Sequence, residues 1–123
     1  MKKIYLALVF LIGIPVVTVI YVSYISNKCV NFAQVIDRVY EDADSRYVKE
    51  DYKDLEKKWD KLEKILSISI NHDEIDSINE SITKGKEYLE NNNIDYFKCE
   101  LKWMKKMIYH VKELEMPTIE NIF

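Results

Sequence analysis

The stretch VKEDYKDLEKKWDKLEKIL, residues 48–66, decides the fold class of this chain. Its apolar side chains recur at steps of three and four residues, and charged side chains fill most of the positions between them. Such spacing places the apolar side chains on one face of an α-helix, whereas a strand would alternate with a period of two. We therefore predict a helix whose apolar face consists of Val48, Tyr52, Leu55, Trp59, Leu62 and Leu66.

Three further stretches show the same helical spacing, and polar breaks at residues 42–46, 67–71 and 91–93 separate the four. Only two glycines and two prolines occur among the 123 residues, which argues against folds that need many tight turns. We predict an all-α fold in which residues 28–123 form a small antiparallel up-down helical bundle. The further apolar faces are Cys29, Phe32, Ile36, Val39 and Ala43; Ile75, Ile78, Ile82, Gly85 and Leu89; and Phe97, Leu101, Met104, Ile108 and Val111.

The short turns also predict which residues share a layer of the bundle. Folding the chain about its three polar breaks brings four side chains to one level: Phe32, Trp59, Ile82 and Met104. Three independent turns give the same layers, so local and global patterns agree. Acidic residues dominate between 72 and 95 and basic residues between 98 and 112, and we expect these opposite charges to favour pairing of the last two helices.

The predicted helix ends carry their own signals. Asn71, with Glu74 three residues later, is typical of a capping box at a helix start. Asparagine tolerates the left-handed conformation that often ends a helix, so residues 91–93 are expected to end the one that follows. Asp95 then caps the last helix, and Pro117 stops it.

The N-terminal part of the chain differs in composition. The run from Ile4 to Ile25 contains no charged side chain and is long enough to cross the ~30 Å hydrocarbon core of a bilayer at a rise of about 1.5 Å per residue. Lys2 and Lys3 precede it, and tyrosines lie near both ends, where their rings favour the headgroup level. We predict a transmembrane anchor over residues 1–27 that continues as a helix into the bundle.

A buried core helix and a cleaved signal peptide are the alternatives to this anchor. The length of the apolar run and its lack of charged side chains argue against a buried core helix in so small a chain. The run is longer than a typical signal-peptide core, and no pair of small residues ends it at a cleavage site. The lysines at the N-terminus favour a cytoplasmic start, although Lys28 and Arg38 weaken that bias. The expectation is a single-pass protein of the cell membrane with an extracytoplasmic bundle.

The two glycines stand alone in the sequence. Gly13 and Gly85 belong to no glycine-rich phosphate-binding loop, which argues against the common nucleotide-binding motifs. Within a helix Gly85 costs ~1 kcal/mol relative to alanine. We interpret it as room for a large neighbour, with Tyr88 and Trp59 as the candidates.

Charge and reactive groups narrow the function classes further. The net charge of −3 gives no electrostatic case for binding nucleic acid. No candidate nucleophile has an adjacent base, so we predict no enzyme, no catalytic residue and no cofactor. Cys29 and Cys99 fall about 12 Å apart along the bundle axis, beyond the ~7 Å that a disulfide spans, so both are expected as packed thiols.

One pole of the bundle gathers histidines and carboxylates. The layers place Asp76 level with His110, and imidazole and carboxylate groups suit zinc or manganese. No HExxH or ExxH motif is present, however, and an alternative is that His110 pairs with Glu113 on its own helix while first-turn carboxylates complement the helix dipole. We predict no metal, with these side chains as the candidates: His72, Asp76, His110 and Glu113.

Apolar residues in one turn and at the C-terminus are candidates for contact with lipid headgroups or with a partner's membrane helix. If the first helix of the bundle continues the anchor, both segments fall at the membrane-facing pole. A packed end-cap is the alternative. The candidates are Ile68, Ile70, Ile119, Ile122 and Phe123.

Several segments together carry a family resemblance. They are the tryptophan-centred helix, HDEID at 72–76, Glu100-Leu101, His110 with Glu113, and TIENI at 118–122. With these segments the chain resembles domain of unknown function family 4363 over most of its length. The resemblance implies a short single-pass membrane protein of endospore-forming Gram-positive bacteria, and it supplies no catalytic residue.

Two functions are compatible with this organisation. We expect a non-enzymatic interaction or accessory subunit of a membrane component, with another membrane protein as its partner. The alternative is an extracytoplasmic module that senses an ion or ligand at the histidine–carboxylate pole.

Overall fold

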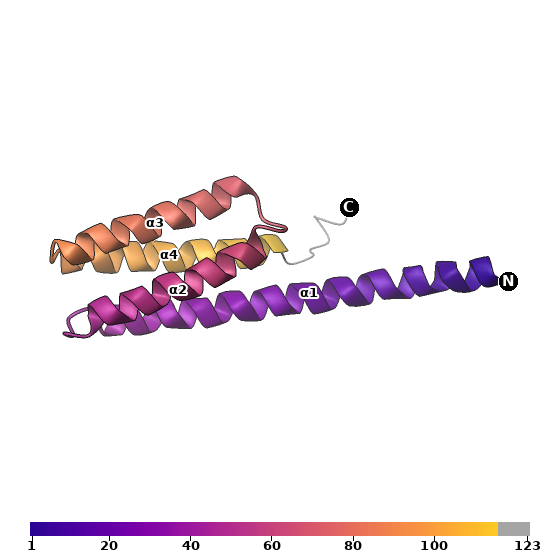
Figure 1. Ribbon diagram of the computed structural model, residues 1–123, viewed down its shortest axis with the longest axis horizontal. Helices are drawn as coiled ribbons and strands as arrows, with labels where there is room; N and C mark the ends of the chain where they lie inside the picture. Colours follow the sequence, from indigo (N-terminus) through magenta and orange to yellow (C-terminus); the bar gives the residue numbers. More distant parts are fainter. Residues whose placement is uncertain (116–123) are drawn as a thin grey trace.

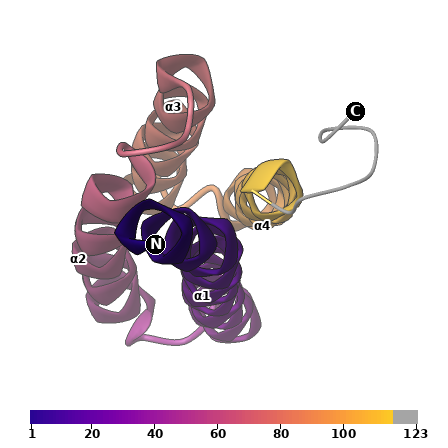
Figure 2. The ribbon, with the colours of Figure 1, turned by 90° about the vertical axis from the view of Figure 1, so that its right-hand side faces the viewer.

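A computed structural model describes residues 1–115 of the chain, which form four helices: α1 (Lys2–Glu41), α2 (Val48–Leu66), α3 (His72–Glu90) and α4 (Ile94–Glu115). The C-terminal half of α1 packs against α2 and α4, while its N-terminal half extends beyond the other helices (Figure 1). Each helix runs antiparallel to the next, and the four surround a common core (Figure 2). The predicted all-α up-down bundle is confirmed, and no strand occurs among residues 1–115.

The core consists of the predicted apolar faces, because every residue assigned to them is buried. The ring of Trp59, which is 2% exposed, lies 5.7 Å from that of Phe32, centroid to centroid. Ile82 and Met104 belong to the same buried cluster. Phe32 and Trp59 of the predicted layer are therefore in contact, and all four of its residues belong to the buried core, in which Trp59 is the largest fully buried side chain.

The space left by Gly85 is filled by Tyr52, so the expectation of Tyr88 or Trp59 was wrong. A Cβ atom added at Gly85 would lie 2.5 Å from the hydroxyl oxygen of Tyr52. That hydroxyl donates a buried hydrogen bond to the carbonyl oxygen of Ile82. The predicted layers compare residue positions along the helices and do not include the length of a side chain. The phenol ring of Tyr52 reaches about one helical turn along α3 from its own layer.

The turn between α3 and α4 confirms the predicted left-handed asparagine. Asn92 has a φ of 56°, in the left-handed region that asparagine tolerates better than most residues. Its N–H donates to the carbonyl of Leu89, and the N–H of Asn93 donates to that of Tyr88. This pair of hydrogen bonds is a Schellman motif, which satisfies carbonyls at the end of α3.

Two predicted helix caps are wrong. Asn71 occupies the N-cap position of α3, as predicted, but its side chain makes no capping hydrogen bond, and the Glu74 carboxylate lies 3.5 Å from His110 of α4, so the capping box does not form. At the start of α4, the Oδ1 atom of Asn93 accepts from the N–H of Tyr96 at 3.5 Å. The helix begins one residue before Asp95, which therefore lies in the first turn, where its charge complements the helix dipole.

α1 is one continuous helix, as predicted for an anchor that enters the bundle. Among residues 1–115 it is the one helix long and apolar enough to cross a membrane. Ile25, expected as the last residue of the span, is fully buried in the bundle core. Packing against the other helices thus begins earlier along α1 than the predicted end of the anchor.

Candidate functional site

The N-terminal half of α1 carries the most extensive exposed apolar surface in the described part of the chain. Between Ile4 and Ile20 the exposure of its large apolar side chains ranges from 46% at Leu8 to 70% at Leu11. These side chains cover all sides of the helix. Soluble surfaces rarely present such a patch, and a helix that is apolar all round is typical of a buried or membrane-embedded segment.

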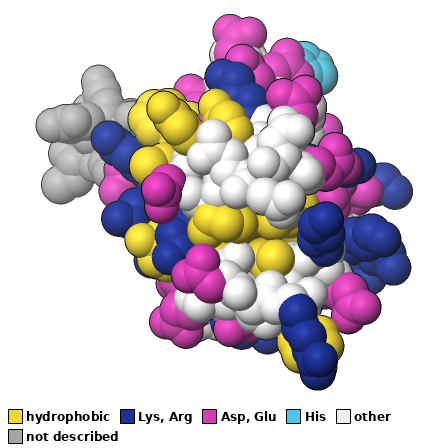
Figure 3. Space-filling model, turned by 90° about the vertical axis from the view of Figure 1, so that its left-hand side faces the viewer, with side chains coloured by type: hydrophobic (Ala, Val, Ile, Leu, Met, Phe, Trp, Pro, Cys, Tyr) yellow, Lys and Arg dark blue, Asp and Glu magenta, His cyan; other side chains and the backbone are white. Residues whose placement is uncertain are grey.

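The opposite end of the molecule has a different surface. Viewed from the end away from the N-terminus, the bundle shows both acidic and basic side chains around scattered apolar ones (Figure 3). Such a mixed surface is typical of contact with water. The contrast gives the molecule an apolar pole and a polar pole.

The turn between α2 and α3 lies beside α1 where the exposed half meets the bundle. The hydroxyl groups of Tyr21 and Ser69 are hydrogen-bonded at 2.7 Å. Ile70 packs partly against the core, whereas Ile68 is 78% exposed. Ile68 is therefore placed as a surface candidate beside the apolar helix, and Ile70 contributes to the end of the core.

The remaining contact candidates, Ile119, Ile122 and Phe123, lie outside the described residues, as does the predicted stop at Pro117.

At the histidine–carboxylate pole the structure brings a histidine and a carboxylate side chain together. Nε2 of His110 lies 3.5 Å from Oε1 of Glu74, not beside Asp76 or Glu113. His72 is exposed at the start of α3. Within residues 1–115 no group of three histidine, cysteine or acidic side chains is arranged to hold a metal ion, and zinc sites in proteins use at least three protein ligands.

The two cysteines differ in environment. Cys29 is buried in the core, as predicted, but Cys99 is exposed on α4 and not packed. The structure shows no disulfide joining them. An exposed thiol in the bundle and a buried one at the end of the apolar helix give two probes of very different accessibility.

Lysines of α4 make their ion pairs with the α1 side of the bundle. Nζ of Lys105 lies 2.8 Å from Oδ1 of Asp37, and Nζ of Lys98 lies 3.5 Å from Oδ2 of Asp44. The hydrogen bond to Asp37 raises the pKa of the Lys105 ammonium group above its ordinary value. α3 and α4 pack together as predicted, but these lysines pair with Asp37 of α1 and with Asp44 in the turn that follows it rather than with the acidic α3.

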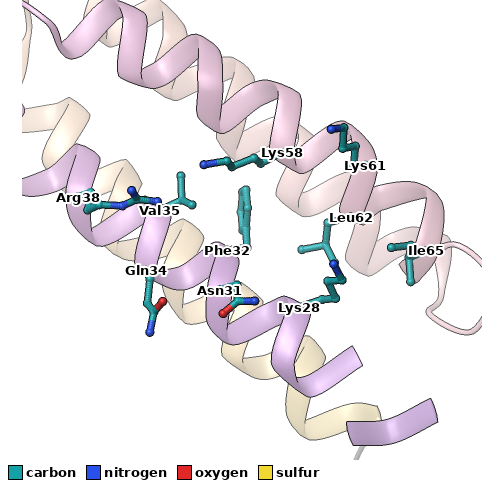
Figure 4. A pocket seen from close by; sticks show the side chains of 10 residues that line it. All are labelled: Lys28, Asn31, Phe32, Gln34, Val35, Arg38, Lys58, Lys61, Leu62 and Ile65. Atoms are coloured by element: carbon teal, nitrogen blue, oxygen red, sulfur yellow. The ribbon is translucent and has the colours of Figure 1, made fainter. Parts of the chain in front are cut away.

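A groove between α1 and α2 was not anticipated from the sequence. It has a volume of about 360 Å³, and its apolar side chains lie between the two helices with cationic ones along the edges (Figure 4). The signal that could have revealed it is a pair of basic residues flanking the apolar face on each helix. The lining residues are Lys28, Asn31, Phe32, Gln34, Val35, Arg38, Lys58, Lys61, Leu62 and Ile65.

The chain was compared with known protein families. Residues 16–122 match the family described as "Domain of unknown function (DUF4363)", which covers most of the chain. The chain belongs to the DUF4363 family. The matched segment includes the last residues of the exposed apolar half of α1 as well as the whole described bundle. Neither the curated proteins nor the solved structures contain a significant match.

Proposed function

We propose that this DUF4363 protein is a single-pass membrane protein whose α1 helix crosses the bilayer as an uncleaved anchor. The bundle is then held at the membrane surface as a non-enzymatic accessory subunit of a membrane component. The observation that carries the proposal is the continuity of α1, which joins an apolar helix exposed on all sides to a half that is packed in the bundle.

The packing of α1 supports an anchor over a cleaved signal peptide. Cleavage near the end of the apolar run would fall within the packed helix. It would detach Tyr21 from its hydrogen bond to Ser69 and remove Ile25 from the core. A signal peptide normally ends before the folded domain begins, so this arrangement favours retention.

Exposed aromatic side chains on α4 support a role in protein interaction. Tyr96 is 60% exposed and Trp103 is 52% exposed, although neither is needed to fill the core. Aromatic residues are enriched at protein interfaces. The partner we propose is another membrane protein, because the anchor restricts the bundle to its neighbours at the bilayer surface. The alternative of a ligand sensor at the histidine–carboxylate pole has weaker support, because the described residues bring only Glu74 and His110 together there.

The proposed topology is supported by Lys2 and Lys3 before the apolar run, which favour a cytoplasmic start and an extracytoplasmic bundle, whereas Lys28 and Arg38 after the run weaken this bias. The native cysteines test both anchor and topology. In intact cells a membrane-impermeant maleimide is expected to label exposed Cys99 but not buried Cys29, and alkaline carbonate is expected to leave the full-length chain in the membrane pellet. Release by carbonate, or a mature chain shortened by the apolar run, would contradict the anchor. Labelling only after lysis would place the bundle on the cytoplasmic side.

In-cell photocrosslinking tests the accessory role. A photoreactive amino acid replacing Trp103 on α4 is expected to yield one dominant crosslinked membrane protein, identified by mass spectrometry. The matched control replaces Lys86, which is exposed on α3. The same set of products from both positions would mean that the α4 surface does not dock a partner.

A further inference from the structure

We propose, resting on the membrane-spanning role of α1 given above, that the groove between α1 and α2 binds the headgroup of an anionic glycerophospholipid from the bilayer that α1 crosses. Four cationic side chains line the groove, and no acidic side chain does. This charge is not a consequence of composition, because the whole chain carries a net charge of −3.

The position of the groove along α1 matches the headgroup layer of the bilayer. A hydrocarbon core of ~30 Å corresponds to about 20 helical residues, so counting from Ile4 it ends near Ser23. The headgroup layer adds roughly 5–7 Å, which is about three to five further residues and ends between Ser26 and Lys28. Lys61 and Ile65 approach the same end of the groove from the last turns of α2. The end of the groove nearest the anchor therefore lies at the level of lipid phosphates.

The two ends of the groove differ in charge balance. At the far end, Nζ of Lys58 lies 2.9 Å from Oδ2 of Asp54, and Arg38 adds to the positive field at that carboxylate. The hydrogen bond from Lys58, with these positive charges, lowers the pKa of the Asp54 carboxyl group. Near the anchor, Lys28 and Lys61 have no carboxylate within ion-pair distance in the described part of the chain. An anion is therefore attracted to the end of the groove that faces the membrane.

The apolar side chains of the groove suit the rest of the lipid. Phe32 and Leu62 stand between the two helices, with Ile65 at the end that also holds Lys28 and Lys61 (Figure 4). They offer a dry surface to the glycerol backbone and the first carbons of the acyl chains, while the lysine ammonium groups meet the phosphate. The volume of about 360 Å³ is within the usual range of ligand sites, roughly 300–1,000 Å³.

The test uses the full-length chain in neutral detergent micelles, with bound lipid counted by native mass spectrometry. Phosphatidylglycerol and phosphatidylcholine of equal chain length are the probes, and glycerol 3-phosphate is the soluble competitor. We expect one phosphatidylglycerol to bind at least ten-fold more tightly than phosphatidylcholine, and glycerol 3-phosphate to displace it only at a far higher concentration.

The double variant Lys28→Gln, Lys61→Gln is expected to weaken phosphatidylglycerol binding by roughly 5-fold for each lysine removed. The matched control is Lys57→Gln, Lys64→Gln, which removes two exposed lysines of α2 outside the groove and should change the affinity less than two-fold. Circular dichroism melts establish that both variants fold. If the groove variant does not fold, the single variant Lys61→Gln provides the same comparison with Lys57→Gln.

Three results would overturn the lipid site. They are equal binding of the two phospholipids, equal losses in the groove and control variants, and displacement by glycerol 3-phosphate at the same concentration as the lipid, which would indicate a site for a soluble anion. Micelle binding is measured on protein already tested by carbonate extraction. A negative result in the lipid-binding experiment therefore contradicts the lipid site alone, whereas release by carbonate contradicts the membrane anchor.

Discussion

The two halves of α1 show how one continuous helix carries two different surfaces. Before Ile20 its apolar side chains cover the whole circumference and are exposed. From Ile25 onward they form one buried stripe, and polar residues occupy the other side. Helical periodicity therefore separates the part of α1 that packs in the bundle from the part whose apolar side chains are exposed on every side, although backbone hydrogen bonding continues through both.

The largest expected effect is in the bundle half of this comparison. Trp59→Ala removes a side chain that packs against Phe32 and donates a hydrogen bond to Asn79 at 2.7 Å. We expect a loss of ~3–5 kcal/mol in the free energy of unfolding, measured by thermal melts monitored by circular dichroism in micelles. Phe10→Ala, in the exposed half, is the matched control and should change bundle stability by less than ~0.5 kcal/mol. An unchanged midpoint for Trp59→Ala would contradict the layer scheme.

A charge introduced into the exposed half of α1 tests whether that half lies in a membrane. Ile12→Lys places an ammonium group near the middle of the apolar run, which costs about 2.5–3.5 kcal/mol for a spanning helix. We expect a smaller carbonate-resistant membrane fraction, quantified by immunoblotting. Glu41→Lys, at the end of α1 inside the bundle region, serves as control and should leave that fraction unchanged. Equal fractions for the two variants would mean that the apolar half is not in a membrane.

The two glycines allow packing inside the bundle, at Gly85 of α3, to be compared with packing along the exposed half of α1, at Gly13. Gly85→Ala meets the Tyr52 hydroxyl at 2.5 Å, whereas a Cβ atom at Gly13 meets nothing within 4 Å. We expect Gly85→Ala to cost ~1–3 kcal/mol of stability in spite of its better helix propensity, and Gly13→Ala to cost none. The double variant with Tyr52→Phe should recover more than half of the loss, because the closest remaining ring atom is 3.3 Å away. Strictly additive effects in denaturant titrations would show that Tyr52 does not fill this space.

The smallest expected effect lies where the halves meet. Tyr21→Phe removes the hydrogen bond to Ser69 and should cost about 0.5–1.5 kcal/mol, at the lower end because the pair is partly exposed. Hydrogen exchange in the turn between α2 and α3 should increase. Tyr24→Phe, one turn further along, should leave exchange in that turn unchanged. If the two variants show identical hydrogen exchange, the hydrogen bond between Tyr21 and Ser69 does not stabilise the turn between α2 and α3.

The sequence predicted the bundle well because helical periodicity is a local property. The stripe from Val48 to Leu66 repeats every three or four residues, and polar residues occur in each break between stripes. The left-handed Asn92 was predictable for the same reason, since its conformational tolerance belongs to the residue itself.

What the sequence did not predict depends on distances between helices. Ile25 is as apolar in a bilayer as in a core, so composition alone placed it in the span. Tyr52 reaches Gly85 only because α2 and α3 lie at a particular separation and rotation. The pairing of Glu74 with His110, and the groove beside Lys28, likewise arise from how neighbouring helices are turned toward each other.

A spin-label scan along α1 tests its division most directly. Single cysteines from Leu11 to Gln34, introduced after Cys29→Ala and Cys99→Ser, are labelled in reconstituted vesicles, and accessibility to oxygen and to a polar nickel complex is measured. The expected profile shows oxygen access on every side up to Ile20. After that residue, accessibility should follow a period of about 3.6, with minima that include Ile25 and Phe32. Nickel access on every side between Leu11 and Ile20 would contradict a helix that passes from lipid into the bundle.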